Sequence, residues 1–282
     1  YAESQISDEK LLHAASIAAE LLDNNEDGIV DDPLVELALL NSNAIMPIFN
    51  SEWSWGQDNV FDHYNGCLGA ALYRQEIDPD NPGQWGYDAS VEEILHTINT
   101  CGQIEVYPET FGLAPNSSLM SEAMDVARGG QFINIPNNYP LEAWYHYDDY
   151  TCDYECMAIE YLYWCIVSNM GILNDIQTCN GIANEWELCT PTLFENTDIL
   201  MHSIVNDSQY KLPILAPDGN YCPSNNTIGD MNNDNVINIL DIVHLINIIL
   251  GTESYSLVAD INEDGEINIL DIVSIVNIIL EN

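Results

Sequence analysis

Two side chains that could bind a metal lie one helical turn apart in the stretch Ser-Val-Glu-Glu-Ile-Leu-His-Thr-Ile at residues 90–98. Glu92 and His96 are four positions apart, so in a helix they share a face, as a pair of metal ligands would. Carboxylates and imidazoles both bind divalent transition metals. A third ligand could come from Glu155 or Glu160, in an apolar run farther along the chain.

The order of these residues resembles the zinc-binding helix of metallopeptidases, H-E-x-x-H. In that motif the two His hold the metal and the Glu between them is the general base. Glu92 stands where the first His belongs, Glu93 where the base belongs and His96 where the second His belongs. A resemblance to zinc peptidases that use a distal glutamate implies Glu160 as the third ligand.

The same stretch also fits an ordinary amphipathic helix, with Ser90 as its N-cap, Glu93 completing a capping box and Gly102 ending it. A carboxylate in place of a His would make a bound zinc ion a poorer Lewis acid. Three interpretations stay open: an ordinary helix, the relic of a zinc-peptidase ancestor and an active metal site. We predict that the protein is not an enzyme and that zinc is not a cofactor.

The clearest pattern is a repeat with a period of 30 residues, in which 230–250 and 260–280 share the string INILDIV. Oxygen ligands fall at the first, third, fifth, seventh, ninth and twelfth places, which is the spacing of an EF-hand calcium loop. The predicted ligands are Asp230, Asn232, Asp234, Val236, Asn238 and Asp241 in the first copy, and Asp260, Asn262, Asp264, Glu266, Asn268 and Asp271 in the second. Gly265 supplies the sharp turn at the sixth place, and Asn235 does so in the first copy.

An apolar helical stripe follows each calcium loop. In the first copy it comprises Ile242, Val243, Leu245, Ile246 and Ile249. The duplicated loop-helix pattern resembles a type I dockerin over about residues 229–282, which implies calcium-dependent docking onto a cohesin domain. Both copies carry Ile-Leu before the last Asp, at 239–240 and 269–270, where dockerins often have Ser or Thr. Packing of this apolar face on the chain's own body or on a neighbouring subunit therefore stays open.

A third acidic loop, LLDNNEDGIVDDP, occupies residues 21–33. Its predicted calcium ligands are Asp23, Asn25, Asp27, Ile29 and Asp31. The twelfth place is Leu34, so Asp32 or Glu36 would have to substitute for the usual acidic residue. The alternative is a polar turn in which Asp32 caps a helix that begins at Pro33.

The remaining pattern is mostly helical, and we predict a mainly α fold with a few short strands. The predicted helices are 7–22, 33–42, 90–101, 118–128 and 153–169, and the predicted strands are 103–108 and 131–135. The predicted domains are a disulfide-stapled N-terminal domain at 1–212, a linker at 213–228 and the calcium-binding module at 229–282. The aromatic run at 143–167 is interpreted as core, including Trp144, Tyr147, Tyr161 and Trp164, rather than as a sugar-binding platform.

The cysteines and sequons predict an exported protein. All eight cysteines, an even number, are expected to pair: Cys67, Cys101, Cys152, Cys156, Cys165, Cys179, Cys189 and Cys222. Glycosylation is predicted at Asn116, Asn206 and Asn225, each in an N-x-S/T sequon. We expect an extracellular chain from which a signal peptide has been removed.

The charge balance restricts the partners. The chain has 46 acidic and 4 basic residues and a formal net charge of −42, which repels nucleic acid and anionic membranes.

Calcium is the expected cofactor, bound by the two loops of the C-terminal repeat and by the acidic loop at residues 21–33. We predict a structural subunit of an extracellular filament or coat, polymerising with copies of itself through its calcium module; a dockerin-bearing zinc-peptidase-like enzyme and a polysaccharide-binding protein are the alternatives.

Overall fold

The chain forms two units, each of which is described by itself. The computed structural model describes residues 1–223, 228–232, 236–252, 257–262 and 264–281. Unit 1 comprises Tyr1–Asn25 and Val30–Tyr221, and unit 2 comprises Glu26–Ile29 and Cys222–Asn282. The predicted boundary differs, because residues 213–221 belong to unit 1. Asn24 Oδ1 accepts hydrogen bonds from the amides of Ile214 and Leu215, which ties this segment to the end of the first helix.

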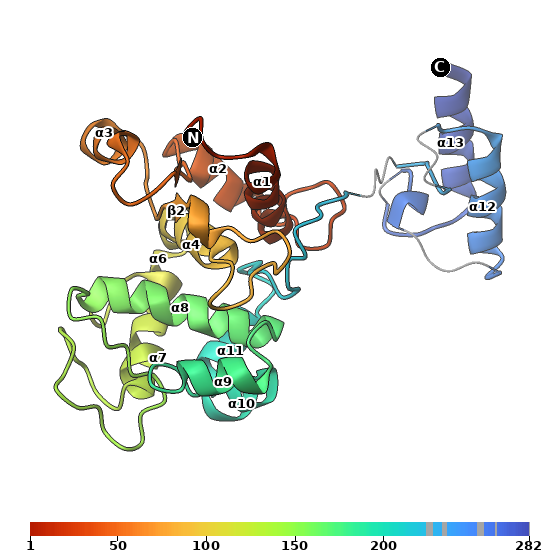
Figure 1. Cartoon of the computed structure of the whole chain (residues 1–282). Helices are drawn as coiled ribbons and strands as arrows, with labels where there is room; N and C mark the ends of the chain where they lie inside the picture. The colour runs from red at the N-terminus through yellow and green to blue at the C-terminus, as the bar shows by residue number, and fades with distance from the viewer. Residues whose placement is uncertain (224–227, 233–235, 253–256, 263, 282) are drawn as a thin grey trace. The chain divides into compact units, whose positions relative to one another are not determined.

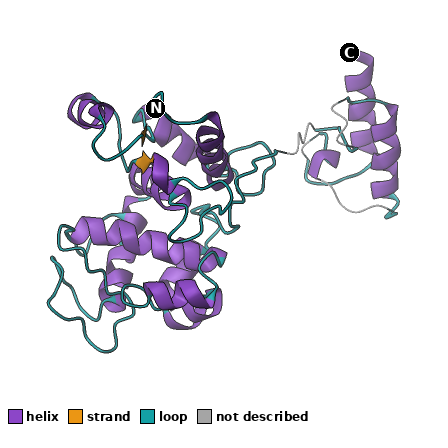
Figure 2. Cartoon of the chain, in the orientation of Figure 1, coloured by secondary structure: helices purple, strands orange, loops and turns teal. Residues whose placement is uncertain are grey.

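Unit 1 is mainly helical, as predicted (Figures 1 and 2). Its α-helices are α1 Asp8–Leu22, α2 Pro33–Asn41, α3 Trp55–His63, α4 Ser90–Ile98, α5 Ile104–Val106, α6 Pro108–Phe111, α7 Leu119–Ala127, α8 Tyr154–Met170, α9 Ile176–Ile182, α10 Pro191–Thr197 and α11 Ile199–Val205. A 3₁₀ turn, η1, spans Arg74–Glu76. Two short parallel strands pair, β1 Ile48–Phe49 and β2 Leu72–Tyr73.

Helix α8 is the central element of unit 1. Its N-cap is Asp153, which accepts a hydrogen bond from the Cys156 amide, and Gly171 ends it in the left-handed conformation at φ 79°. Apolar and aromatic residues occupy most of its circumference, which is typical of a helix buried on several sides. Helices α4, α7, α10 and α11 pack against it. Tyr161 and Trp164 are therefore core residues, which contradicts the alternative of a sugar-binding platform in this run.

Helix α4 continues past its predicted end. A π-helical segment, η2, spans Asn99–Gln103 and leads directly into α5, so Gly102 does not end the helix. A Cβ at Gly102 would lie 2.7 Å from Val35 Cγ1, so its absence lets α2 pack closely here. The predicted strand at 103–108 is wrong for the same reason, because this segment is helical up to Val106. The predicted strand at 131–135 is also wrong: Asn134 forms only an isolated bridge to Asp153.

Three disulfides form rather than four. Cys67 pairs with Cys101, Cys152 with Cys156 and Cys179 with Cys189. Cys165, buried in α8, and the exposed Cys222 are free thiols, so the prediction that all eight cysteines pair is wrong. The bridge between Cys67 and Cys101 attaches the η2 turn to the segment before β2.

In the described part of unit 2, each repeat contributes one helix, α12 Ile239–Ile249 and α13 Ile269–Glu281, and a 3₁₀ turn, η3, spans Leu257–Ala259. Leu245, Ala259 and Ile275 form its buried core among the described residues. The predicted apolar stripe divides between two faces. Ile242 and Leu245 point into the core, whereas Val243, Ile246 and Ile249 remain exposed.

Candidate functional site

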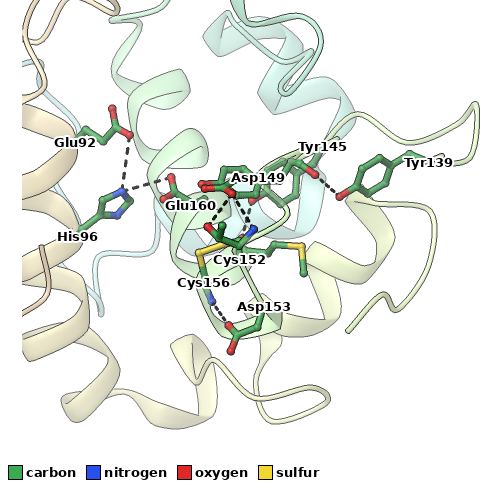
Figure 3. Close-up of a disulfide and its surroundings, with 12 residues drawn as sticks. Glu92, His96, Tyr139, Tyr145, Asp149, Cys152, Asp153, Cys156 and Glu160 are labelled. Carbon is green, nitrogen blue, oxygen red and sulfur yellow. Dashed lines mark hydrogen bonds and ion pairs between the residues drawn. A yellow bond between two sulfur atoms is a disulfide. The ribbon is translucent and has the colours of Figure 1, made fainter. Parts of the chain in front are cut away.

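The side chains of Glu92, His96 and Glu160 meet between α4 and α8. His96 Nε2 lies 4.0 Å from Glu92 Oε1 and 3.4 Å from Glu160 Oε2 (Figure 3). One ligand atom from each residue lies within 4.8 Å of the others. The helical spacing of Glu92 and His96 places them on one face of α4, and α8 brings Glu160 to that face. The predicted triad is therefore assembled in space.

Burial controls the protonation of this cluster. It raises the pKa of Glu92 to about 7 and that of Glu93 to about 8, with a further increase from the neighbouring carboxylates. Burial alone would lower the pKa of His96, but the charges of Glu160, Glu92 and Glu93 raise it to about 9. At neutral pH His96 therefore carries a proton when no other cation is present.

The cluster fits a divalent cation. His96 is only 5% exposed, and neither of its ring nitrogens has a hydrogen-bond partner among the residues that the structure describes. Nε2 faces two carboxylates, and one imidazole with two carboxylates is a ligand set that zinc and similar divalent metals use. Two carboxylates would also balance the charge of the ion. A divalent cation would thus take the place of the proton on His96.

Glu93 stands at the position of the base in the motif. Its side chain lines a cavity that His96 and Glu160 also line. This cavity has a volume of about 400 Å³, and its lining includes Glu93, His96, Glu155 and Glu160. Three carboxylates around one imidazole make it strongly acidic. A molecule that enters it therefore meets two of the three candidate ligands, His96 and Glu160, together with the candidate base.

Asp88 fixes the start of α4. Its carboxylate accepts hydrogen bonds from the Ser90 amide and hydroxyl, the Gly83 amide and the Asp78 amide, and it pairs with His13 Nε2 at 3.0 Å. The predicted N-cap was wrong: Ser90 is the first helical residue, and Ala89 precedes it without a side-chain cap. Burial disfavours the charged form of Asp88, but these hydrogen bonds outweigh it and lower its pKa.

We expect Asp88→Ala to lower the free energy of unfolding by about 2–4 kcal/mol at pH 7, because it leaves several buried donors unpaired. Urea unfolding measures this, with the exposed Asp80→Ala as a matched control. Because the pKa of Asp88 is lowered in the folded state, its stabilisation is present above the unfolded pKa of about 4 and is lost as the pH falls through the folded pKa. Equal losses at pH 7 and in strong acid would contradict this role.

The two repeats of unit 2 form matching loops. Asp241 Oδ1 accepts hydrogen bonds from the Met231 and Asn232 amides, and its Oδ2 accepts one from the Asn238 amide. Asp271 receives the equivalent bonds from Ile261, Asn262 and Asn268, thirty residues later. Gly265 has φ 85°, as the predicted sharp turn requires. Asp234 and Asn235 lie outside the described residues.

These loops fit calcium. Asp230, Asp241 and Asp271 are fully buried, and the sequence has no Lys or Arg after residue 211 to neutralise them. Hard oxygen ligands at EF-hand spacing are the donors that calcium prefers. In both loops the ninth-place Asn caps the following helix, since Asn238 and Asn268 accept hydrogen bonds from the Leu240 and Leu270 amides. In each repeat, the same Asn side chain is therefore both a predicted calcium ligand of the loop and the cap of the helix that follows.

The third acidic loop is divided between the two units. Asp23, Asn25 and Asp31 lie in unit 1, and Asp27 and Ile29 lie in unit 2. In unit 1, Asp23 accepts a hydrogen bond from the Tyr221 hydroxyl, and Asp31 accepts one from the Asn24 amide. Asp32 caps α2, with Pro33 as the first helical residue, as the polar-turn alternative predicted. Calcium in this loop stays a prediction.

Two of the predicted glycosylation sites can be located. Asn116 and Asn206 are exposed, and both already form hydrogen bonds, Asn116 with Gln131 and Asn206 with Asn169. Asn225 lies outside the described residues. Their modification stays a prediction.

The family model of the type I dockerin domain matches residues 228–280. The C-terminal region is therefore a type I dockerin, a calcium-binding module through which extracellular proteins typically dock onto cohesin domains. No curated protein and no solved structure matches the chain. Within the described part of the chain, no helix combines the length and the apolar character needed to cross a membrane.

Proposed function

We propose that this protein is a component of an extracellular, cohesin-organised complex, in which the dockerin anchors unit 1 to a scaffold. The dockerin match over 228–280, with its two loops, carries this proposal. Each repeat presents exposed apolar side chains at the start of its helix, Ile239 and Leu240 in one and Ile269 and Leu270 in the other. These residues supply an apolar contact surface for the cohesin.

Capture by immobilised cohesin domains tests this proposal. We expect the full-length chain to bind at least one member of a cohesin panel with calcium present and to be released by EDTA. Ile239→Asp combined with Ile269→Asp should abolish capture, whereas the control Leu141→Asp, at an exposed position in unit 1, should not. If no cohesin binds and electron microscopy shows filaments that chelation disperses, the filament interpretation is correct instead.

The second candidate function is metal-dependent hydrolysis of peptides by unit 1. The observation that favours it is the shared cavity: Glu93 lines the same space as His96 and Glu160. A divalent cation bound by Glu92, His96 and Glu160 would supply Lewis-acid chemistry. Burial and the neighbouring carboxylates raise the pKa of Glu93 to about 8, and the charge of a bound cation would lower it, so that the ionised carboxylate could accept the proton of the attacking water. Glu160 would hold the cation from the buried helix α8.

The carboxylate of Glu92 lowers the expected rate of this reaction. It adds a negative charge to the metal shell where the related motif has a neutral imidazole, and this charge weakens a Lewis acid. We therefore infer a slow hydrolase. Binding of the metal without any turnover would favour the relic of a zinc-peptidase ancestor, one of the three interpretations that the sequence left open.

A further inference from the structure

A second cavity lies against the first turn of α4. It has a volume of about 230 Å³, and its walls include the carboxylates of Glu76 and Glu92 and the aromatic rings of Trp85, Tyr87 and Tyr163. Glu92 belongs both to this cavity and to the metal-binding cluster. The Tyr163 ring also packs against His96, with ring centroids 5.6 Å apart. The cavity and the cluster are therefore direct neighbours.

The walls of this cavity combine negative charge with aromatic faces. Aromatic rings attract cations through their quadrupoles, and carboxylates pair with them directly. None of the four basic residues of the chain, Lys10, Arg74, Arg128 and Lys211, lines the cavity, so an anion finds no partner there. A hydrated metal ion would gain little from three rings. The chemistry therefore favours an organic cation.

Trp85 and Tyr87, two of the aromatic walls, are held in position although their rings remain exposed to solvent. The hydrogen bonds from Gly83, Asp78 and Ser90 to Asp88 fix the loop that carries Trp85 and Tyr87. A Cβ at Gly181 would lie 2.7 Å from the Trp85 ring, so this ring rests directly on α9. Trp85 and Tyr87 nevertheless remain 40% and 59% exposed. A ligand could cover these surfaces without rearrangement of the loop.

We propose that this cavity binds the Lys or Arg side chain of a peptide, next to the Glu92/His96/Glu160 cluster. The inference rests on the proposed hydrolase function, because it makes a basic peptide the substrate of that site. Glu76 pairs with the charged group of the side chain, Glu92 adds to the negative potential of the wall next to the cluster, and Trp85 and Tyr87 cover the alkyl stem and cationic head. The acidic cavity beside the cluster, with Glu93, Glu155 and Glu160, attracts further basic residues of the same peptide.

Binding of paired peptides to the full-length Glu93→Gln protein tests the proposal, because this variant should not cleave them. One peptide carries Arg and the other carries citrulline, its neutral isostere, and fluorescence anisotropy measures both affinities. We expect the Arg peptide to bind about 10-fold more tightly, as a cation–π and carboxylate site predicts. Trp85→Leu and Glu76→Gln should each reduce this preference several-fold, and Trp85→Phe should retain most of it.

Trp53→Leu is the matched control, because Trp53 is 89% exposed and does not line the cavity. Equal affinity for the two peptides, or a preference that survives both Trp85→Leu and Glu76→Gln, would overturn the proposal. Metal content and cleavage are measured on the unsubstituted chain. Cleavage of Arg and citrulline peptides at equal rates would refute recognition of the Arg side chain by the cavity and would still support the proposed hydrolase function. If the Arg peptide binds more tightly but the unsubstituted chain neither cleaves it nor contains a metal, recognition of Arg by the cavity is supported and the hydrolase function is refuted.

Discussion

Replacement of Glu93 by Gln is expected to reduce peptide hydrolysis by about 10³-fold while the chain keeps one bound metal ion. A positioned general base contributes roughly 10²–10⁴-fold to such reactions, and Gln cannot accept the proton. The amide has nearly the shape of the carboxylate, so the packing of α4 is preserved. Glu93 is not one of the three grouped ligands, and metal content should therefore not change. Cleavage of a basic peptide library and elemental analysis of the same samples measure the two quantities.

Glu122→Gln is the control for this substitution, because Glu122 is exposed on α7 and lines neither cavity beside the cluster. It should retain hydrolysis to within a few-fold. His96→Ala should lose both the metal and the activity, since it removes the one nitrogen ligand. Hydrolysis that persists at the original rate in Glu93→Gln would show that another group is the base.

Removal of calcium is expected to unfold unit 2 while unit 1 keeps its structure. Few of the described side chains of unit 2 form its core, and the buried carboxylates of Asp230, Asp241 and Asp271 are costly to keep ionised away from water when no cation is bound. Calcium at 1,000 times its Kd would stabilise a site by about 4 kcal/mol. Unit 1 has three disulfides and a much larger core. Hydrogen exchange with calcium and with EDTA measures the two units separately.

A double variant of the calcium loops and a control variant in unit 1 test whether this response depends on the predicted ligands. Asp241→Ala combined with Asp271→Ala should make the exchange of unit 2 fast even when calcium is saturating. Asp175→Ala, at the N-cap of α9 in unit 1, should leave the calcium response unchanged. Slow exchange throughout unit 2 after chelation would mean that its apolar contacts suffice and that calcium serves only docking.

Local spacing was enough to predict the calcium module and part of the metal cluster. The loops of unit 2 depend on ligands within twelve consecutive residues, and Glu92 and His96 depend on one helical turn, so both patterns are visible in the sequence. Glu160 lies 64 residues after His96, and only the resemblance to distal-glutamate peptidases singled it out. The packing of α8 against α4 is what brings it there.

Long-range packing explains what the sequence did not reveal. Ile104–Val106 has β-branched residues that favour a strand, but the helix that begins at Ser90 continues through this segment, with the Cys67–Cys101 bridge attached to its η2 turn. The cavity at Trp85 and Tyr87 needs Tyr163 from α8 and Glu76 from η1, and no local spacing connects these residues. Gly83 and Gly86, on either side of Trp85, favour a turn, but the local sequence does not indicate what the aromatic side chains of that turn would face.

The π-helical turn at Asn99–Gln103 has a consequence for how this chain can vary in length. A π turn holds one residue more than an α-helical turn, so it is where a continuous helix accommodates an insertion. Deleting one residue there would restore regular α-helical geometry without rotating the segments on either side, whereas a deletion elsewhere in the helix would rotate everything after it by about 100°. Glu92 and His96, which precede the turn, and Ile104 and Val106, which follow it, would all keep their orientation after a deletion within the turn. Natural length changes in this helix should therefore cluster within these five positions.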